Sequence, residues 1–172
     1  IKSLDLSKFT SPVESGNVTL IIRDKQLIVS KEYLAIHSPV FSRMFYGDFI
    51  EKDKKEIETK EVEYDDFVNL LLLIFPNPVA ISDYTVVSIA SLADRYQMTG
   101  VSKSAENHLL QSGKFTTVQK LQLADDYRFV KLREACLQSF QGVQELKMIK
   151  DSQEFGSFSD NMLASICKRM MQ

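Results

Sequence analysis

Residues 17–47, NVTLIIRDKQLIVSKEYLAIHSPVFSRMFYG, have the most informative pattern in the chain. The stretch opens with two β-branched runs, residues 17–22 and 27–29, and the charged turn between them completes the pattern of a β-hairpin. Apolar residues then recur at helical spacing on either side of Ser38-Pro39, which supplies an N-cap and a first-turn proline. These apolar residues are Tyr33, Leu34, Ile36, Phe41, Met44 and Phe45. The stretch therefore predicts a hairpin followed by two short helices.

Beyond these helices the pattern predicts one more strand and then only helices. Residues 56–62 alternate weakly between apolar and charged side chains, as in an edge strand, and residues 64–75 have the spacing of an amphipathic helix. Proline cannot continue the helical hydrogen-bond ladder, so Pro-Asn-Pro at 76–78 must end that helix. Either Ser82 or Asp83 can cap the next one. The expected fold class is α+β.

Two later segments of the chain resemble each other. Residues 92–105 and 123–136 share Leu-Ala-Asp-x-Tyr and the same apolar spacing after it, and each predicts a helix, a turn and a helix. Two such hairpins can bury their apolar faces on each other without forming a solenoid. Residues 112–117, with Thr116 or Thr117 as N-cap, mark the joint to an all-helical tail that ends in a further amphipathic helix.

Length, charge and cysteine content exclude several classes of protein. The 172 residues carry 21 basic and 23 acidic side chains, and a net charge of −2 disfavours binding to nucleic acid or to an anionic membrane. The longest apolar run, residues 70–75, is far shorter than the roughly 20 residues of a membrane span. Cys136 and Cys167 lie in apolar helical patterns typical of reduced thiols, which predicts a cytoplasmic and/or nuclear location. The first residue, Ile1, suggests a piece of a longer protein.

Side chains suited to catalysis are few and scattered. His37 and His108 are the only histidines, and the pattern places them at a helix end and on a helix surface, where structural roles are expected. The acid pairs at 65–66 and 125–126 are adjacent in sequence, so on a helix their side chains diverge. Six glycines without a phosphate-binding spacing leave no phosphate cradle. We therefore expect no enzyme, no catalytic residue, no cofactor and no metal.

Three blocks of the sequence together resemble the BTB (POZ) domain. They are VSKEYLAIHSPVFSRMF at 29–45, EIETKEVEYDDFVNLLLLIFP at 56–76 and SIASLADRYQMTGVSKSAENHLL at 88–110. Within that superfamily, LDLSKFTSP at 4–12 and FPNP at 75–78 resemble the BTB half of MATH-BTB (BATH) proteins, relatives of the speckle-type POZ protein.

The resemblance implies a small sheet flanked by helical hairpins, dimerisation, and recruitment of cullin three so that a bound substrate is ubiquitinated. Residues 1–15 then form an N-terminal dimerisation segment, residues 16–111 the BTB/POZ domain and residues 112–172 a BACK-like helical tail. Within the tail, residues 113–140 resemble the three-box and the start of a BACK domain, which in the family extends the cullin groove.

The resemblance also implies a cullin-binding site. Cullin-binding relatives carry a hydrophobic-x-acid motif just past the second hairpin helix, and here it falls on Phe49-Ile50-Glu51. Phe49 would enter a pocket on the cullin and dominate the binding energy, while Glu51 would cap a partner helix or hold the loop in shape. The alternative is that Phe49 folds back onto its own domain. The residues expected to bind cullin three are Tyr46, Asp48, Phe49, Ile50, Glu51, Tyr96 and Gln97.

The expected dimer interface depends on apolar surface rather than on a charged pocket. Many BTB domains carry an acid before the first strand and a basic pair at the first helix, whereas this chain has Asn17, Ser30 and Lys31. An asparagine and a lysine cannot form a salt bridge, so a charge-dependent corepressor groove is less expected than a cullin adaptor. The expected interface residues are Ile1, Leu4, Leu6, Phe9, Lys31, Leu34, Ile36 and Phe41. For the N-terminal residues, packing on the domain's own flank is the alternative.

The sequence thus predicts a homodimeric substrate adaptor that binds the N-terminal region of cullin three and delivers a substrate held by a missing upstream domain. The alternative is a BTB dimerisation or scaffold domain of a transcriptional or structural assembly that binds no cullin. Neither function involves nucleic acid or a membrane.

Overall fold

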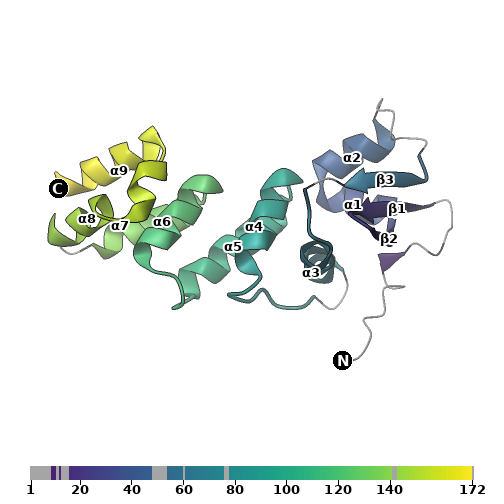
Figure 1. The fold of residues 1–172 in the computed structure, drawn as a ribbon, viewed down its shortest axis with the longest axis horizontal. Coiled ribbons are helices and arrows are strands. Elements are labelled where there is room, and N and C mark those ends of the chain that lie inside the picture. Colours follow the sequence, from purple (N-terminus) through teal and green to yellow (C-terminus); the bar gives the residue numbers. More distant parts are fainter. Residues whose placement is uncertain are drawn as a thin grey trace. The chain divides into compact units, whose positions relative to one another are not determined.

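The computed structural model describes residues 9–10, 12, 16–47, 54–59, 61–75, 78–140 and 143–171 (Figure 1). The chain divides into two compact units, the first with residues 1–81 and 88–102, the second with residues 82–87 and 103–172. This division falls within helix α5 (Thr99–Gln111), whereas the sequence placed a domain boundary after residue 111. The predicted domain boundaries stay a prediction.

The first unit contains a three-stranded sheet in the order β2-β1-β3. Strand β1 (Asn17–Ile22) pairs antiparallel with β2 (Lys25–Ser30), and β3 (Glu56–Thr59) pairs in parallel with β1. Because alternate residues of a strand point to the same face, Val18 and Leu20 of β1 are both buried. The predicted hairpin and edge strand are confirmed, although β3 ends three residues earlier than the predicted range of 56–62.

Two serines cap the pair of helices that follows the hairpin. Helix α1 (Lys31–His37) begins where Ser30 Oγ accepts a hydrogen bond from the Tyr33 amide at 3.2 Å. Helix α2 (Pro39–Tyr46) begins where Ser38 Oγ accepts from the Phe41 amide at 3.1 Å. The cap and the first-turn proline predicted for α2 are confirmed.

Gly47 is the C-cap residue of helix α2, and the backbone leaves no room for a side chain there. Its backbone N–H donates to Arg43 O at 2.8 Å, and a Cβ atom at this position would lie 2.4 Å from that same oxygen. A side chain at residue 47 would therefore displace the last turn of the helix, immediately before the predicted partner-binding motif.

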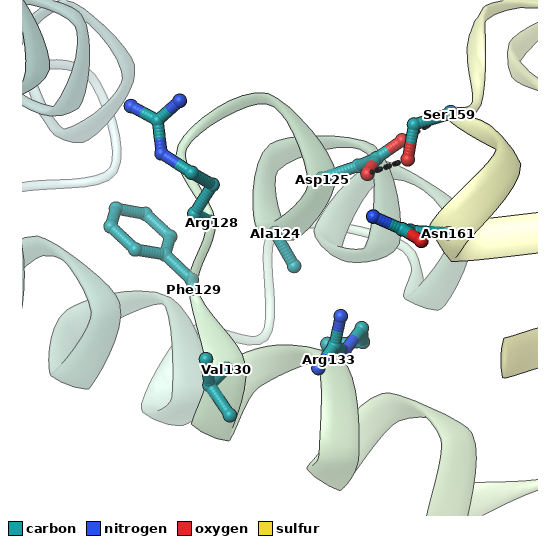
Figure 2. A pocket seen from close by; sticks show the side chains of 8 residues that line it. All are labelled: Ala124, Asp125, Arg128, Phe129, Val130, Arg133, Ser159 and Asn161. Atoms are coloured by element: carbon teal, nitrogen blue, oxygen red, sulfur yellow. Dashed lines mark hydrogen bonds between the residues drawn. The ribbon is translucent and has the colours of Figure 1, made fainter.

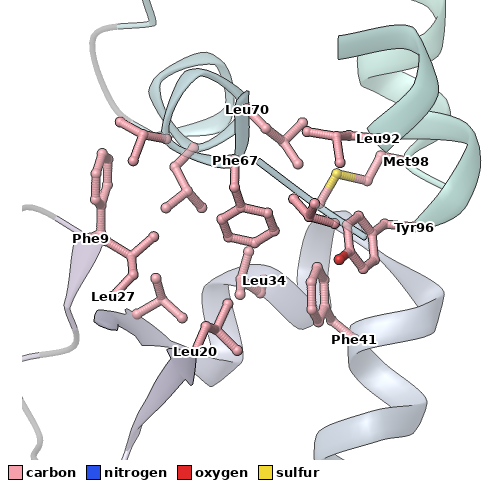
Figure 3. Packing of buried hydrophobic residues seen from close by; sticks show 14 of the residues in the cluster. Phe9, Leu20, Leu27, Leu34, Phe41, Phe67, Leu70, Leu92, Tyr96 and Met98 are labelled. Atoms are coloured by element: carbon pink, nitrogen blue, oxygen red, sulfur yellow. The ribbon is translucent and has the colours of Figure 1, made fainter. Parts of the chain in front are cut away.

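Three further helices complete the core of the first unit (Figure 3). They are α3 (Tyr64–Ile74), the part of α4 (Val86–Arg95) from Ser88 onward, and the first turn of α5, residues 99–102. Figure 3 shows that side chains from the hairpin, from α2 and α3 and from the α4–α5 turn converge around Phe67. Helix α4 begins at Val86, later than predicted, after a turn at residues 83–85 across which the Val86 amide donates to Ser82 O at 2.9 Å.

The described part of the second unit is helical. It contains α6 (Thr117–Asp126), α7 (Val130–Ser139), α8 (Val143–Lys150), a 3-10 helix (Gln153–Ser157) and α9 (Asp160–Met170). Thr116 caps α6 in a reciprocal arrangement: its Oγ1 accepts from the Gln119 amide at 3.2 Å, and its own amide donates to Gln119 Oε1 at 3.0 Å. The predicted N-cap is confirmed at Thr116.

The two Leu-Ala-Asp-x-Tyr segments form the same turn. Gln97 and Arg128 follow the two tyrosines and both have positive φ, 53° and 57°. In the first copy the Met98 amide donates to Ala93 O at 2.8 Å, and in the second the Phe129 amide donates to Ala124 O at 2.9 Å. This backbone bond, which spans six residues and encloses a left-handed residue, is characteristic of the Schellman motif that ends helices. The internal repeat therefore encodes a helix, a Schellman turn and a second helix.

Side chains from other helices satisfy both ends of helix α7, which has no cap of its own at Phe129. At its start, Glu106 Oε1 of α5 accepts hydrogen bonds from the Lys131 amide at 2.8 Å and the Leu132 amide at 3.1 Å. At its end, Arg169 of α9 donates to Leu137 O and Phe140 O at 3.1 and 3.0 Å. An acid at the amino end and a base at the carboxyl end both complement the helix dipole.

Replacing Glu106 with alanine should destabilise the chain by about 1–3 kcal/mol, because two amides at the start of α7 lose their acceptor. Glu106 is buried at 8% exposure, so water cannot easily replace it. Urea unfolding followed by circular dichroism measures the change. Glu106→Gln keeps an acceptor oxygen and should cost less, and Glu134→Ala on the exposed side of α7 should be nearly neutral. Equal effects of Glu106→Ala and Glu134→Ala would contradict the cap.

Candidate functional site

The residues predicted to bind a partner gather at the end of α2 and at the α4–α5 turn. Tyr46 is the last residue of α2 and is 56% exposed, and Gln97 is exposed in the turn. Arg43 of α2 donates from Nη2 to Gln97 Oε1 at 3.4 Å, so these two segments lie side by side. Asp48, Phe49, Ile50 and Glu51 lie outside the described residues.

The position of Tyr96 corrects one prediction. Its side chain is only 4% exposed and stacks on Phe41 with ring centroids 4.4 Å apart, so it cannot offer a large contact surface to a partner. Burial raises the pKa of Tyr96 to about 12. Its carbonyl oxygen accepts a hydrogen bond from Ser38 Oγ at 2.6 Å. Tyr96 therefore positions the turn that carries Gln97 instead of presenting its own ring.

A groove of ≈290 Å³ lies beside this surface. Its lining residues are Val40, Phe41, Met44, Glu58, Thr59, Arg95 and Tyr96. Arg95 at its rim donates to Glu61 O and Glu61 Oε2, both at 3.1 Å, which fixes the guanidinium on the β3–α3 loop. The sequence did not predict this groove, because its walls come from α2, β3 and the end of α4, which are distant in the chain. The only sequence signal is the spacing of Val40 and Met44 on one helix face.

The residues predicted at a dimer interface fall into three groups. Phe9, Leu34 and Phe41 are at most 1% exposed, so the prediction that they offer apolar surface is wrong for this chain conformation. Ile36 is 73% exposed and Lys31 is half-buried, which leaves both within reach of a partner. The third group, Ile1, Leu4 and Leu6, lies outside the described residues.

Phe9, near the N-terminus, packs on aromatic side chains of its own chain. Its ring meets Phe75 edge-on at 4.9 Å, and Tyr33 stacks on the same Phe75 at 4.1 Å. Tyr33 Oη donates to Ile74 O at 2.6 Å. In the single chain, Phe9 therefore packs on its own domain, which is the alternative given above for the N-terminal residues.

The second unit has a pocket of its own, ≈260 Å³ in volume, between the α6–α7 turn and the start of α9 (Figure 2). Ala124, Asp125, Arg128, Phe129, Val130, Arg133, Ser159 and Asn161 line it. Asp125 accepts hydrogen bonds from Ser159 N and Ser159 Oγ, both at 2.6 Å, so its two oxygens fasten α9 to the turn. The carboxylate holds the fold together, and the pocket contains no pair of acids suited to proton transfer.

The histidines have structural partners. Asp83 Oδ1 contacts His108 Nε2 at 2.8 Å and accepts a hydrogen bond from Ser112 Oγ at 2.7 Å. Both contacts lower the pKa of the Asp83 carboxyl group, and the hydrogen bond from Ser112 has the larger effect. His108 and Ser112 each contact the Asp83 carboxylate separately, so these three side chains form no relay from the histidine to the serine. Burial lowers the pKa of His37, whose ring lies 5.0 Å from that of Tyr33.

Among the residues that the structure describes, no three His, Cys, Asp or Glu side chains are grouped so that they could hold a metal ion. None of the helices in the described ranges combines the length and apolar character that crossing a membrane requires.

Comparisons with known proteins agree with the fold. A family model described as BTB/POZ domain matches residues 7–113. The chain is 33% identical over 156 residues to BTB and MATH domain-containing protein 38 of Caenorhabditis elegans, covering 91% of this chain and 40% of that protein. It is 31% identical over 153 residues to BTB and MATH domain-containing protein 36 of the same organism, covering 88% and 48%. Kelch-like protein 30 of Mus musculus is 28% identical over 106 residues, covering 62% and 18%. The chain spans less than half the length of each of these relatives.

Proposed function

Since the chain belongs to the BTB/POZ domain family and is a protein-interaction module, we propose that it is a non-enzymatic adaptor that binds the N-terminal region of cullin three. The observation that carries the proposal is the surface shared by α2 and the α4–α5 turn. Tyr46 and Gln97 are exposed there, and the Phe49-Ile50-Glu51 motif follows α2 after only two residues.

The interior of the first unit supports this surface with rigid contacts. The Ser38–Tyr96 hydrogen bond and the Phe41–Tyr96 stack fix the α4–α5 turn against α2. Because both segments are held in place before a partner arrives, binding would order few further side chains, and affinity benefits from that preorganisation. The groove next to Arg95 offers the partner a depression in which Val40, Phe41 and Met44 lie beside polar side chains.

The adaptor is proposed to act as a homodimer. Ile36 on α1 is the most exposed of the apolar side chains predicted at the interface and described here, and a two-fold axis would let this one patch meet itself. The two most similar relatives cited above carry MATH in their names, and the chain spans less than half of each. We propose that a domain outside this chain holds the substrate, in the cytoplasm and/or nucleus, and that the dimer presents two such substrates for ubiquitination.

Calorimetry with the N-terminal region of cullin three tests the proposal. We expect binding by the chain, and a loss of affinity of about 30-fold or more for Phe49→Ala, the size of an interface hot spot. Glu51→Ala should also weaken binding. Ile28→Ala is a matched control, because Ile28 is 51% exposed on strand β2, which lies at the opposite edge of the sheet from β3.

Mass measurement of the chain alone and mixed with the cullin fragment separates the two candidate functions. A dimer that takes up the cullin fragment supports the adaptor. A stable dimer without a cullin complex at micromolar concentration would favour the scaffold function instead. Tight binding that survives both Phe49→Ala and Glu51→Ala would refute the assigned site.

A further inference from the structure

Tyr84 is an unusually accessible tyrosine. Its side chain is 87% exposed, and it lies in the turn of residues 83–85 that precedes helix α4. The preceding residues 78–82 form neither helix nor strand, and residues 78–80 are exposed. An enzyme could therefore hold the chain on the amino-terminal side of Tyr84 in an extended form without first unfolding a helix.

The surroundings of Tyr84 favour a negative charge. Lys114 Nζ lies 3.7 Å from the centroid of the Tyr84 ring, in a cation–π contact. The positive end of the α4 dipole begins two residues later, at Val86. The carboxylate of the adjacent Asp83 is occupied by other partners, because it contacts His108 Nε2 at 2.8 Å and accepts a hydrogen bond from Ser112 Oγ at 2.7 Å.

From this geometry we infer that Tyr84 is a phosphorylation site for a tyrosine kinase and that Lys114 binds the phosphate. In the reaction, Tyr84 Oη attacks the γ-phosphorus of ATP, the bond to ADP breaks, and the phenolic proton passes to the base of the kinase. The new group carries a charge of about −1.5 to −2 at neutral pH and accepts charge-assisted hydrogen bonds from a lysine.

The other described tyrosines fit this role less well. Tyr46 is also exposed, at 56%, but it ends helix α2, where the dipole is negative. Burial and the nearby Glu32 carboxylate raise the pKa of the Tyr46 phenol, which shows that a negative charge is disfavoured there. Tyr96 is buried, and Tyr33 donates its hydroxyl hydrogen to Ile74 O. Tyr64 and Tyr127 are half-buried.

Phosphorylation would act on the joint between α5 and α6. The Lys114 amide donates to Ser112 Oγ at 3.1 Å, and Lys120 Nζ donates to Ser112 O at 2.7 Å. Lys114 would move from the face of the Tyr84 ring to the phosphate oxygens and form an ion pair with them. This ion pair would connect the α5–α6 link to the turn before α4, in addition to the contacts of Asp83 with His108 and Ser112. Phosphorylation of Tyr84 thus adds an ion pair within the second unit.

The test uses the whole chain, a broad-specificity tyrosine kinase catalytic domain and MgATP. Mass spectrometry should find phosphate on Tyr84 ahead of Tyr46, and Tyr84→Phe should remove that label. Phosphorus NMR then follows the second pKa of the phosphate between pH 4 and 8. A nearby cation favours the dianion, so this pKa should lie about 0.2–0.7 unit lower than in phosphorylated Lys114→Met, as for one exposed ion pair.

Lys103→Met is the matched control, because Lys103 is an exposed lysine of the same unit on helix α5. It should leave the phosphate pKa unchanged. Labelling at Tyr46 in place of Tyr84 would overturn the inference, and so would equal phosphate pKa values in the parent chain and in Lys114→Met. Neither result depends on cullin binding, so the inference and the proposed function can fail separately.

Discussion

Replacing Phe41 with alanine is expected to lower the free energy of unfolding by about 3–5 kcal/mol, because it empties a large buried site. Phe41 is 1% exposed. Its ring stacks on Tyr96 at 4.4 Å and on Phe45 at 5.5 Å, and it meets Phe67 edge-on at 6.2 Å. Aromatic pairs of this kind contribute beyond the area that they bury. Urea unfolding followed by circular dichroism, at two protein concentrations, measures the loss.

Ile36→Ala is the matched control, because Ile36 lies on α1 and is 73% exposed. Its unfolding free energy per chain should change by no more than about 0.5 kcal/mol, as for most surface substitutions. Its dimer dissociation constant, measured by analytical ultracentrifugation, should rise. The opposite pattern, with Phe41→Ala affecting only dimerisation, would mean that Phe41 faces a partner chain and that the single-chain core is misassigned.

Replacing Ser38 with alanine should cost about 2–4 kcal/mol, since one hydroxyl makes two buried hydrogen bonds. Ser38 is 0% exposed. Its Oγ accepts from the Phe41 amide at 3.1 Å and donates to Tyr96 O at 2.6 Å. Alanine removes the helix cap and also leaves a buried carbonyl oxygen without its donor, and the second loss is the larger. The same urea unfolding experiment measures the sum.

Ser30→Ala separates these two losses. Ser30 caps α1 through the Tyr33 amide at 3.2 Å, so its removal should cost about 1 kcal/mol, the usual value of a cap. The excess of Ser38→Ala over Ser30→Ala reports the bond to Tyr96. Ser38→Ala should also weaken cullin binding, because the bond to Tyr96 holds the turn that carries Gln97. If Ser38→Ala costs no more than Ser30→Ala, the link between α2 and the turn contributes nothing.

Local features of the fold could be predicted because they depend on residues close in sequence. The alternation in residues 17–22 specifies a strand with one buried face, and Ser38-Pro39 specifies where a helix begins. The shared Leu-Ala-Asp-x-Tyr likewise produces the same turn twice, since the bonds of a Schellman motif span only six residues. The helix after residue 82 was placed too early, because residues 82–85 form a hydrogen-bonded turn in which Thr85 Oγ1 accepts from the Ser82 amide.

The candidate site could be predicted only in part. The resemblance pointed to Tyr46 and Gln97, and the structure exposes both. The groove rimmed by Arg95 and the carboxylate of Glu106 at the start of α7 escaped prediction, because each depends on segments distant in the chain.

The order of residues alone specifies which of them are apolar and which helix or strand face they share. Periodicity placed Leu34, Ile36 and Phe41 on helices, but it carries no information on what covers each face. In the folded chain, Leu34 and Phe41 are covered by other segments of the same chain, while Ile36 stays exposed. Burial depends on how segments distant in the sequence pack together in three dimensions. Because the hydrophobic effect has no direction, the same apolar side chain can stabilise either an interior or an interface.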